Sequence, residues 1–309
     1  MGFIGGSIQF AIMKTSAIGI DLGCTNIKAA VVDAEGTVVA ERRVETREYD
    51  DKYWKEAVKS IIETLRASTG SVVKTIGLCA PGLANADNSA IVCMPGRLAG
   101  LEQFHWSAFL GEPVHVLNDA HAALTAEAAF GAAKGCRHAV LVTLGSGVGG
   151  AILIDGKLYQ GLGQMAGHLG HITVNANDFH LDVTNMPGSI EDAIGNVTIA
   201  ERSRGKYETT FQLIDAYREG NAFASWLWLD AVRKLSVSIA SLINILSPEV
   251  VVVGGGISLA GDALFKPLEE FLALYEWRPG GKQTVIRAAQ YSDMAGALGA
   301  AAFALSKQS

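Results

Sequence analysis

The sequence lacks the features that mark several large classes of protein. No apolar run reaches the ~18 residues that a membrane-spanning helix needs. Charged residues make up only 18% of the 309 residues, and the net charge is −6. Lys and Arg do not cluster, whereas a nucleic-acid surface needs clustered cations to neutralise phosphates. Neither a membrane nor a nucleic-acid partner is therefore expected.

Cysteine is scarce, and its spacing excludes a Cys-x-x-Cys metal or redox motif. The four cysteines stand apart in apolar or glycine-rich surroundings: Cys24, Cys79, Cys93 and Cys136. This pattern is typical of small buried or half-buried thiols in a reducing compartment. Residues 1–13 have neither the basic segment nor the cleavage site of a secretory signal peptide. We therefore expect a cytoplasmic protein in which residues 1–13 form a disordered extension.

Two familiar phosphate-binding motifs are also missing. The pattern GxxxxGK[ST] does not occur, which excludes a P-loop. A dinucleotide-binding fold needs a glycine turn that leads into a helix. Here the turns after Leu22 and Leu144 lead into β-type runs, and Gly254-Gly255-Gly256 does not complete a GxGxxG motif. A Rossmann-type dehydrogenase is therefore not expected.

The sequence does contain an alternation of short strands and helices, with 49% apolar residues and 35 glycines. Helical spacing of Trp54, Val58, Ile61 and Leu65 predicts a helix over 53–65. Other apolar runs predict strands over 18–21, 28–33, 37–46, 75–79, 114–117, 138–144, 151–155, 157–159, 250–253 and 284–288. Further helices are expected over 120–133, 207–219, 222–246, 262–274 and 295–305, with Trp226 and Trp228 as packing residues.

One internal similarity organises the chain. Residues 22–33 align without a gap to residues 144–155, which lie 122 positions later. Both segments have the pattern strand, glycine turn, strand and turn, and a further strand follows each. The chain is therefore predicted to contain two related halves, each opening with a hairpin whose glycine turn faces a shared cleft.

The two glycine turns carry groups that suit phosphate, because a concave set of backbone N–H donors binds an anion. The first turn contains Gly23, Thr25 and Asn26, and Lys28 follows it. The second turn, Gly145, Ser146 and Gly147, has almost no side chains, so its backbone can approach a ligand closely. For each turn alone, a plain hairpin is the alternative; their matching places in a repeat favour phosphate binding.

Two carboxylates stand at strand ends near these turns. Asp21 closes the first strand, and Asp119 lies between a strand and a helix, where carboxylates often cap the helix. Beside two phosphate turns, the pair indicates phosphoryl transfer. Asp21 would then help to hold Mg²⁺ through water, and Asp119 would accept the proton of the attacking hydroxyl.

Taken in order, these motifs resemble the ROK family (repressors, open reading frames and kinases) over residues 18–305. The similar segments are 20–25, 118–119, 143–150, 166–171, 253–256 and 293–301. The resemblance implies an α/β fold of the two-domain actin/hexokinase-like kind, a duplicated ribonuclease H-like fold with an interdomain cleft. The smaller domain would contain residues 14–119 and about 294–309, and the larger would contain residues 120–293. The implied activity is that of a glucokinase-like sugar kinase.

The resemblance also implies a site. ATP with Mg²⁺ would lie between the two glycine turns, and a sugar hydroxyl would lie near Asp119, the general base. The residues expected around ATP are Asp21, Gly23, Thr25, Asn26, Lys28, Gly145, Ser146, Gly147, Gly254, Gly255 and Gly256. Those expected around the sugar are Gly82, Arg97, Asn118, Asp119, His168, His171 and Glu191. Family members often dimerise, so a homodimer is expected.

The chain departs from the family pattern at its zinc site and in its first phosphate motif. The family's three zinc-binding cysteines correspond to Asp182, Thr184 and Ser189, although His171 is kept. Structural zinc prefers a closed set of thiolate and imidazole ligands, so no structural zinc is expected. Cys24 replaces a usual glycine in the first phosphate motif.

The sugar motif departs as well, and it leaves two hypotheses. His168 replaces a usual Glu and Arg97 a usual Asn. One hypothesis is an acidic sugar, because Arg suits anions. The other is a neutral sugar, with Arg97 in solvent and His168 donating to a hydroxyl.

The function also has an alternative, a catalytically weak sugar sensor or regulator of the same family without a DNA-binding domain. The sequence leaves open the sugar, its reactive hydroxyl, and the choice between ATP and polyphosphate.

Overall fold

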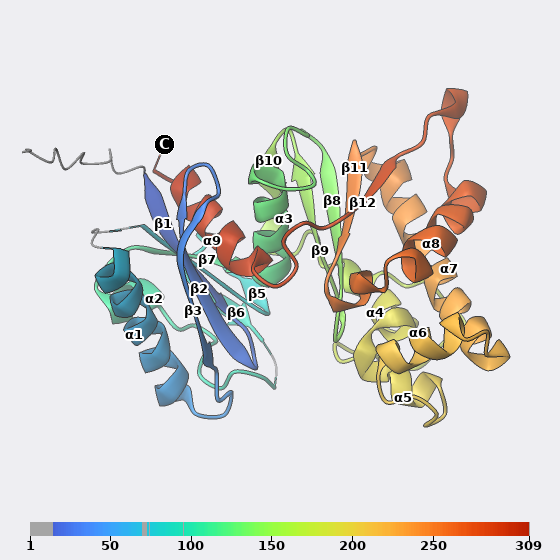
Figure 1. The fold of residues 1–309 in the computed structure, drawn as a ribbon, viewed down its shortest axis with the longest axis horizontal. Coiled ribbons are helices and arrows are strands. Elements are labelled where there is room, and N and C mark those ends of the chain that lie inside the picture. The colour runs from blue at the N-terminus through green and yellow to red at the C-terminus, as the bar shows by residue number, and fades with distance from the viewer. Residues whose placement is uncertain (1–14, 70–72, 74, 95, 309) are drawn as a thin grey trace, which may run out of the picture.

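The computed structural model describes residues 15–69, 73, 75–94 and 96–308. Two halves lie side by side, each built on a five-stranded sheet (Figure 1). The expected extension over residues 1–13 lies outside the described residues. The first sheet has the order β3-β2-β1-β4-β7 and the second β10-β9-β8-β11-β12. Their strands are β1 Ser16–Leu22, β2 Asn26–Asp33, β3 Val38–Glu45, β4 Thr75–Ala80, β7 Val114–Asn118, β8 Ala139–Leu144, β9 Val148–Ile154, β10 Lys157–Tyr159, β11 Val250–Gly254 and β12 Val285–Ala288.

The two sheets repeat one topology, as the internal similarity predicted. In the first sheet β1 pairs antiparallel with β2 and parallel with β4. In the second sheet β8 pairs antiparallel with β9 and parallel with β11. The antiparallel pairs β2–β3 and β9–β10 and the parallel pairs β4–β7 and β11–β12 also correspond. The fold is therefore a duplicated ribonuclease H-like unit.

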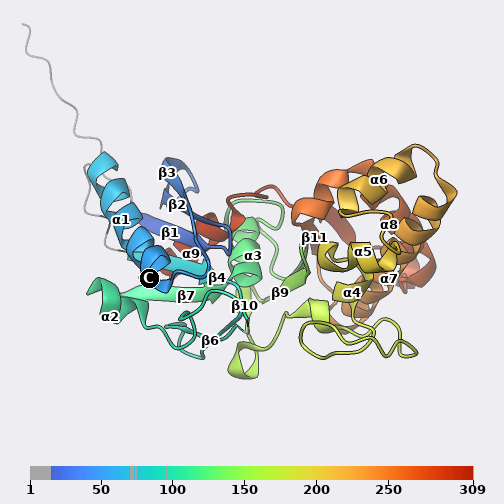
Figure 2. The same cartoon turned by 90° about the horizontal axis from the view of Figure 1, so that it is seen from below.

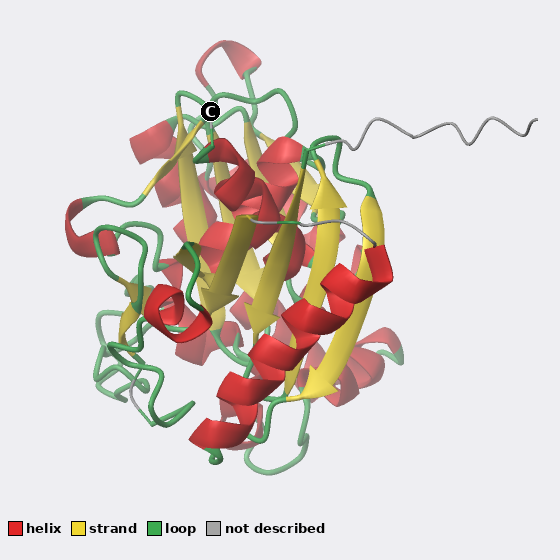
Figure 3. Ribbon diagram, turned by 90° about the vertical axis from the view of Figure 1, so that its left-hand side faces the viewer, coloured by secondary structure: helices red, strands yellow, loops and turns green. Residues whose placement is uncertain are grey.

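Two long helices cover opposite faces of the first sheet. Helix α1, Asp51–Thr69, lies across one face (Figure 3) and buries Trp54, Val58, Ile61, Ile62 and Leu65 there. Helix α9, Ala295–Ser306, covers the other face, although it follows the whole second half in sequence. The core of the first half is therefore completed by a distant segment of the chain.

The backbone of α9 approaches its neighbours unusually closely. A Cβ atom at Gly19 of β1 would lie 1.8 Å from the Ala297 carbonyl oxygen, and one at Gly299 would lie 1.7 Å from that of Ala122. Ala122 belongs to α3, Asp119–Ala129, the other helix between the two halves. Because no side chain fits at these contacts, α9 is held between β1 and α3 by direct backbone packing.

Both faces of the second sheet are also covered by helices. On β11, Val250 and Val252 pack in the cluster that contains Leu124 of α3, whereas Val251 and Val253 pack toward α7, Ala222–Leu246, and α8, Asp262–Tyr275. Figures 1 and 2 show the resulting layers: α1, the first sheet, α9 and α3, the second sheet, then α7 and α8. A strand buried on both faces explains the continuous valine run of β11.

Most predicted elements are present, with ends shifted by a few residues. The helix expected over 120–133 ends at Ala129, and the strand expected from residue 151 begins at Val148. The prediction for Trp226 was wrong, because its side chain is 64% exposed, whereas Trp228 is buried and donates to the Ala263 carbonyl. Elements not predicted are β5 Leu83–Ala84, β6 Ile91–Cys93, α2 Trp106–Leu110, α4 Ile190–Ile194 and α5 Ile199–Arg202; α6, Thr210–Arg218, lies within the helix expected over 207–219.

No helix of the described residues is both long and apolar enough to cross a membrane. The four cysteines are unpaired, and Cys93 is exposed rather than buried. The expectation of buried or half-buried thiols is therefore confirmed for Cys24, Cys79 and Cys136 and was wrong for Cys93.

Candidate active site

The carboxyl ends of parallel strands from both sheets meet at one cavity of about 280 Å³. Asp21 and Asp119 line it from the first half, and Thr143 and Gly254 line it from the second. Ligands in α/β folds bind outside the carboxyl ends of strands. The other lining residues are Gly23, Ala120, Ala123, Glu127, Leu141, Gly255, Ala289, Tyr291, Ser292, Ala295 and Gly296.

The first glycine turn, Gly23 to Asn26, joins β1 to β2. The Gly23 N–H donates to the Asn26 carbonyl at 3.1 Å. Thr46, which is buried directly after β3, donates its hydroxyl to the Gly23 carbonyl at 2.6 Å and its N–H to the Thr25 carbonyl at 2.9 Å. No local motif marks Thr46, so its role in holding the turn was not predicted.

The second glycine turn, Gly145 to Gly147, joins β8 to β9. Glu191 of α4 lies beneath it, and its Oε2 accepts the Val148 N–H at 3.0 Å. A Cβ atom at Gly147 would lie 2.2 Å from the same oxygen, so a larger residue there would displace the Glu191 carboxylate. The predicted sugar ligand Glu191 therefore contacts the second phosphate turn directly.

A third glycine segment completes the second-half wall. Gly254 ends β11 beside Thr143 of β8, and the next residue, Gly255, has φ +83°. A Cβ atom at Gly255 would lie 2.3 Å from the Leu144 carbonyl oxygen. The Gly254–Gly256 segment, which was expected near ATP, is therefore packed against β8, the strand that leads into the second glycine turn.

Asp119 is the first residue of α3, but the residue before it caps the helix. Asn118 Oδ1 accepts the N–H groups of Ala120 and His121, and its amide donates to the Gly82 carbonyl at 2.9 Å. Asp119 Oδ1 accepts the Ala120 N–H at 2.8 Å. Its side chain is open to solvent at the cavity, yet surrounding protein raises its pKa by desolvation. The residue that caps α3 is therefore Asn118, and not Asp119 as the alternative interpretation of the sequence had it.

Asp21 is the second carboxylate of the cavity, and it has a cationic neighbour. Burial, partly offset by Lys28 and reinforced by the nearby charge of Asp119, raises the pKa of Asp21 to about 6. The Lys28 Nζ lies 3.8 Å from Asp21 and 2.8 Å from Asp293. Asp293 also pairs with Arg43. Asp293 thus joins the segment before α9 to the first hairpin.

Two histidines lie near Asp119 in the fold but outside the cavity wall. His121 of α3 is buried, and its Nε2 lies 2.9 Å from the Ala166 carbonyl, which fixes the segment that carries His168. The two imidazole rings are 5.7 Å apart. Burial lowers the pKa of both side chains, to about 4 for His121. His168 Nε2 is buried and has no hydrogen-bond partner among the described residues.

Arg97 lies at a different place from the histidines. Its guanidinium forms a two-pronged ion pair with Glu48, in which Nη2 lies 2.9 Å from Oε2. The Arg97 side chain is 48% exposed. The cation that motivated the acidic-sugar hypothesis is therefore neutralised by a carboxylate of the same chain.

The positions of the family's zinc ligands form a hydrogen-bonded cluster. Asp182 Oδ1 accepts from the Thr184 N–H and hydroxyl and from the Met186 N–H, while Oδ2 lies 3.5 Å from His171. Burial would raise the pKa of Asp182, but hydrogen bonds from Met186, Thr184 and Ser189 outweigh it and lower the pKa to about 2. The described residues contain no group of three or more metal-binding side chains.

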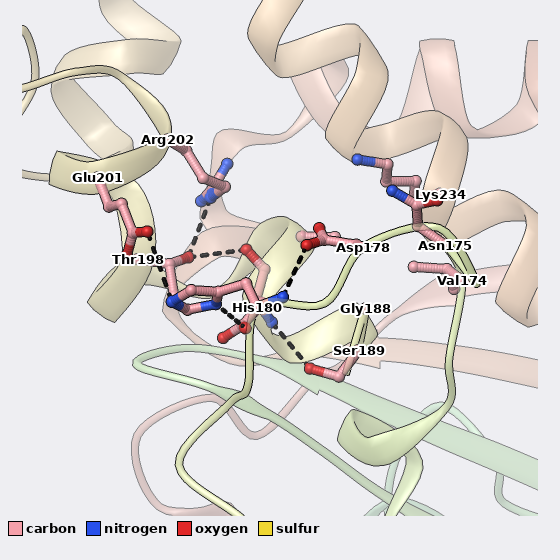
Figure 4. Close-up of a pocket in the computed structure, with 12 residues that line it drawn as sticks. Val174, Asn175, Asp178, His180, Gly188, Ser189, Thr198, Glu201, Arg202 and Lys234 are labelled. Atoms are coloured by element: carbon pink, nitrogen blue, oxygen red, sulfur yellow. Dashed lines mark hydrogen bonds and ion pairs between the residues drawn. The ribbon is translucent and has the colours of Figure 1, made fainter. Parts of the chain in front are cut away.

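A second cavity, also of about 280 Å³, lies in the same loop region (Figure 4). His180 stands between two carboxylates there, with Nδ1 2.8 Å from Asp192 and Nε2 3.4 Å from Glu201. Arg202 donates to Thr198 Oγ1 at 3.0 Å. Neither Asp119 nor a glycine turn lines this cavity, so its size alone does not make it the active site.

The main cavity brings together only part of the predicted site. Of the predicted residues it contains Asp21, Gly23, Asp119, Gly254 and Gly255. Thr143, Glu127 and Tyr291 were not predicted. Thr143 had a signal, since it aligns with Asp21 in the repeat; Glu127 and Tyr291 had none, because they meet only through the fold. The other predicted residues are not among those that line this cavity.

The fold and this cavity define the actin/hexokinase-like class, and comparison with known proteins gives the family. The ROK family model matches residues 17–307, and the chain belongs to the ROK family. It is 30% identical over 288 residues to a glucokinase of Thermotoga maritima, which covers 85% of this chain and 88% of the relative. The sequence-based prediction of a sugar kinase of this family is confirmed.

Two solved structures support the same conclusion. A ROK hexokinase of Thermus thermophilus has a TM-score of 0.84 and 28% identity, covering 95% of this chain and 100% of the other. A ROK family glucokinase of Streptomyces griseus, solved in complex with glucose and AMPPNP, has a TM-score of 0.77 and 27% identity, covering 94% and 99%. These neighbours confirm the predicted two-domain fold class.

Proposed function

We propose that this sugar kinase transfers the γ-phosphoryl group of ATP to a hydroxyl of a neutral hexose, with Asp119 as the general base. The observation that carries the proposal is the place of Asp119. It lines the cavity shared by both halves, its charge interacts with His168, and Asn118 rather than Asp119 caps α3. The Streptomyces griseus neighbour, which binds glucose and AMPPNP, supports the same pair of ligands.

In the proposed reaction, the sugar hydroxyl oxygen forms a bond to the γ-phosphorus as the bond to the β-phosphate oxygen breaks. The hydroxyl proton passes to the Asp119 carboxylate, and ADP leaves. Backbone N–H groups of the two glycine turns would bind the phosphates. Closure of the cleft would exclude water, which otherwise competes with the sugar as the attacking group.

Asp21 fits a role in holding Mg²⁺. It is a carboxylate in the cavity wall whose nearest cation, Lys28, is 3.8 Å away, so its oxygens are not fully paired. Mg²⁺ in phosphotransferases keeps several waters and binds one or two carboxylates together with substrate phosphates. When bound, the ion would neutralise charge on the phosphate oxygens.

The electrostatics favour a neutral sugar over an acidic one. Arg97 is paired with Glu48, and the lowered pKa of His168 keeps its imidazole uncharged near pH 7. The unpartnered Nε2 of His168 would meet a sugar hydroxyl in place of the carboxylate usual in the family. Gly82, Asn118, His171 and Glu191 remain proposed parts of the sugar side.

The proposal includes the wider organisation expected from the sequence. Residues 14–119 with 294–309 would form one domain and residues 120–293 the other, with α3 and α9 between the two sheets. Lys28, Thr25, Asn26, Ser146 and Gly256 would lie along the nucleotide. A cytoplasmic homodimer that uses ATP rather than polyphosphate completes the proposal.

A coupled ADP-release assay tests the function directly. Mg-ATP would be supplied with neutral hexoses, N-acetylated amino sugars and sugar acids, beside the Asp119→Asn variant. We expect hexose-dependent turnover that falls by about 10²–10⁴ in the variant, the usual worth of a general base. Turnover with sugar acids alone would overturn the neutral-sugar proposal. Sugar and ATP binding without any turnover would instead indicate a sensor.

A further inference from the structure

Glu127 is a completely buried carboxylate on the last turn of α3, and the proposed reaction does not use it. It accepts three backbone N–H groups. Oε2 accepts from Ala132 at 2.7 Å, and Oε1 accepts from Gln290 and Tyr291 at 2.8 Å each. Such charge-assisted hydrogen bonds are stronger than those between neutral groups.

The three donors belong to the segments by which the chain enters and leaves the second sheet. Ala132 lies in the segment from α3 to β8, and Gln290 and Tyr291 lie in the segment from β12 to α9. The Glu127 carboxylate thus joins these two segments. Arg287 of β12 and the Tyr291 hydroxyl add hydrogen bonds across the same junction, to the carbonyls of Ala132 at 2.7 Å and Phe130 at 3.4 Å. These two segments are far apart in sequence: Gln290 lies 163 positions after Glu127.

This junction has little room for another arrangement. A Cβ atom at Gly131 would lie 2.2 Å from Glu127 Oε2 and 3.0 Å from the Tyr291 ring. No described Lys, Arg or His side chain forms an ion pair with Glu127, so the backbone donors alone satisfy its charge. An uncompensated buried carboxylate would be costly, which makes the three contacts mutually dependent.

The segment that Glu127 holds is part of the cavity wall. Tyr291 and Ser292 line the cavity, and Asp293 pairs with Lys28 beside Asp21. Residues 289–294 are therefore fixed at one end by Glu127 and at the other by the first hairpin. A shift of this segment would move one wall of the cavity relative to Asp21.

We propose that Glu127 is a positioning residue that fixes residues 289–294 against α3 and thereby shapes the nucleotide side of the cavity. The inference rests on the proposed function in one respect, since it takes the occupant of this wall to be the nucleotide. The anchoring itself can be measured without any ligand.

The test compares Glu127→Gln with Glu269→Gln, an exposed glutamate on α8. Glutamine keeps the size of the side chain, but it has one acceptor oxygen where three N–H groups need two. Amide hydrogen exchange at Ala132, Gln290 and Tyr291 reports the anchoring. Calorimetric titration with a non-hydrolysable ATP analogue and, separately, with glucose reports the two ligand sites.

We expect Glu127→Gln to exchange these amides at least about tenfold faster and to bind the analogue about tenfold more weakly, a change of ~1.4 kcal/mol. Glucose affinity should change by less than about twofold, and Glu269→Gln should change nothing. A purely structural role would instead lower the melting temperature and weaken both ligands together. Unchanged exchange and unchanged nucleotide affinity in a folded variant would overturn the inference, and so would equal losses for both ligands.

Two further outcomes are decisive. If Glu127→Gln does not fold, exchange in the unaltered protein decides: amides at Gln290 and Tyr291 that exchange as fast as exposed loops would overturn the anchoring. If the unaltered protein binds glucose but no nucleotide, the proposed function fails and takes the nucleotide part of the inference with it. Faster exchange in Glu127→Gln would still support the anchoring in that case.

Discussion

The first and second hairpins share one topology but bring different chemistry to the cavity. In the β1–β2 hairpin Asp21 pairs in register with Lys28, whereas in the β8–β9 hairpin the equivalent pair is Thr143 and Gly149. Four residues separate Leu22 from its partner Ile27, but only three separate Leu144 from Val148. The second turn is therefore one residue shorter than the first, although residues 22–33 and 144–155 align in sequence without a gap.

The difference shows how a duplicated unit can divide the work of one site. The first half supplies ionisable side chains, Asp21, Lys28 and Asp119. The second half supplies backbone at its turn, and Glu191 lies so close beneath the turn that a side chain at Gly147 would displace its carboxylate. A phosphate group needs both fixed donors and a balance of charge, and in the proposed reaction each half would provide one of these.

Removing the charge from the first hairpin should have the largest effect. We expect Asp21→Asn to lower kcat by at least about a hundredfold, in line with the loss of one electrostatic contact to the transition state. Thr143→Ala, the matched change in the second hairpin, should cost less than about tenfold. Steady-state kinetics with a Mg²⁺ titration checks both variants. Equal losses would contradict the division of work between the halves.

The next largest difference between the two turns is expected when a glycine in each is replaced by alanine, which adds one methyl group. Gly147→Ala would place Cβ 2.2 Å from Glu191 Oε2, whereas Gly23→Ala would meet only the Asn26 carbonyl at 3.0 Å. We expect Gly147→Ala to destabilise the protein by ~1–3 kcal/mol through overpacking, and Gly23→Ala by less. Gly145→Ala is the control, because no atom lies within 4 Å of its Cβ. Urea unfolding would measure all three, and a Gly147→Ala variant as stable as the control would refute the tight packing.

Two carboxylates, one in each half, should change stability with pH in opposite directions. The pKa of Asp21 is raised to about 6, so its contribution is present below about pH 4 and is lost as the pH rises through 6. The pKa of Asp182 is lowered to about 2, so its contribution is present above about pH 4 and is lost as the pH falls toward 2.

At pH 7 and without ligands, Asp21→Asn should therefore raise the free energy of unfolding by about 1 kcal/mol or more, because one pKa unit corresponds to ~1.4 kcal/mol. Asp182→Asn should lower it by ~1.5–3 kcal/mol through lost charge-assisted hydrogen bonds. Denaturation at pH 2.5, 3, 4, 5, 6 and 7 would show both slopes, that of Asp182 below pH 4 and that of Asp21 between pH 4 and 6. Shifts of the same sign in the two variants would be inconsistent with these environments.

The smallest effect is expected at the rim of the first half. Arg97→Gln removes an ion pair whose arginine is 48% exposed, and such pairs contribute ~0–1 kcal/mol. The KM for a neutral hexose should change by less than about threefold, since neither group is needed for a neutral ligand. Glu48→Gln is the matched control for the pair. A large rise in KM in Arg97→Gln, without a similar rise in Glu48→Gln, would indicate that Arg97 contacts the sugar.

Sequence patterns predicted the features that depend on neighbouring residues. Periodicity and glycine turns located both hairpins, and the order of motifs led to the family and its fold. The strand-to-helix junction at Asn118 and Asp119 was also located, but not which of the two caps α3. That choice depends on the Gly82 carbonyl, which lies in another loop and holds the Asn118 amide.

What the sequence could not predict depends on contacts across the fold. Arg97 looked like a free cation because Glu48, 49 residues earlier, carries no sign of the pairing. Trp226 and Trp228 lie two positions apart on α7, and only the packing of α8 decides which is buried. Glu127 and Thr46 are ordinary residues in sequence and gain their roles from backbone groups brought to them.

The placement of α9 has a consequence for how the chain is made. Gly19 of β1 and Gly77 of β4 leave room for the backbone of α9, because Cβ atoms there would lie 1.8 and 1.9 Å from its carbonyl oxygens. During synthesis, α9 leaves the ribosome only after every strand of the second sheet. The second half can therefore finish folding first, while one apolar face of the first sheet remains uncovered. The half that is synthesised first is therefore the half whose core is completed last.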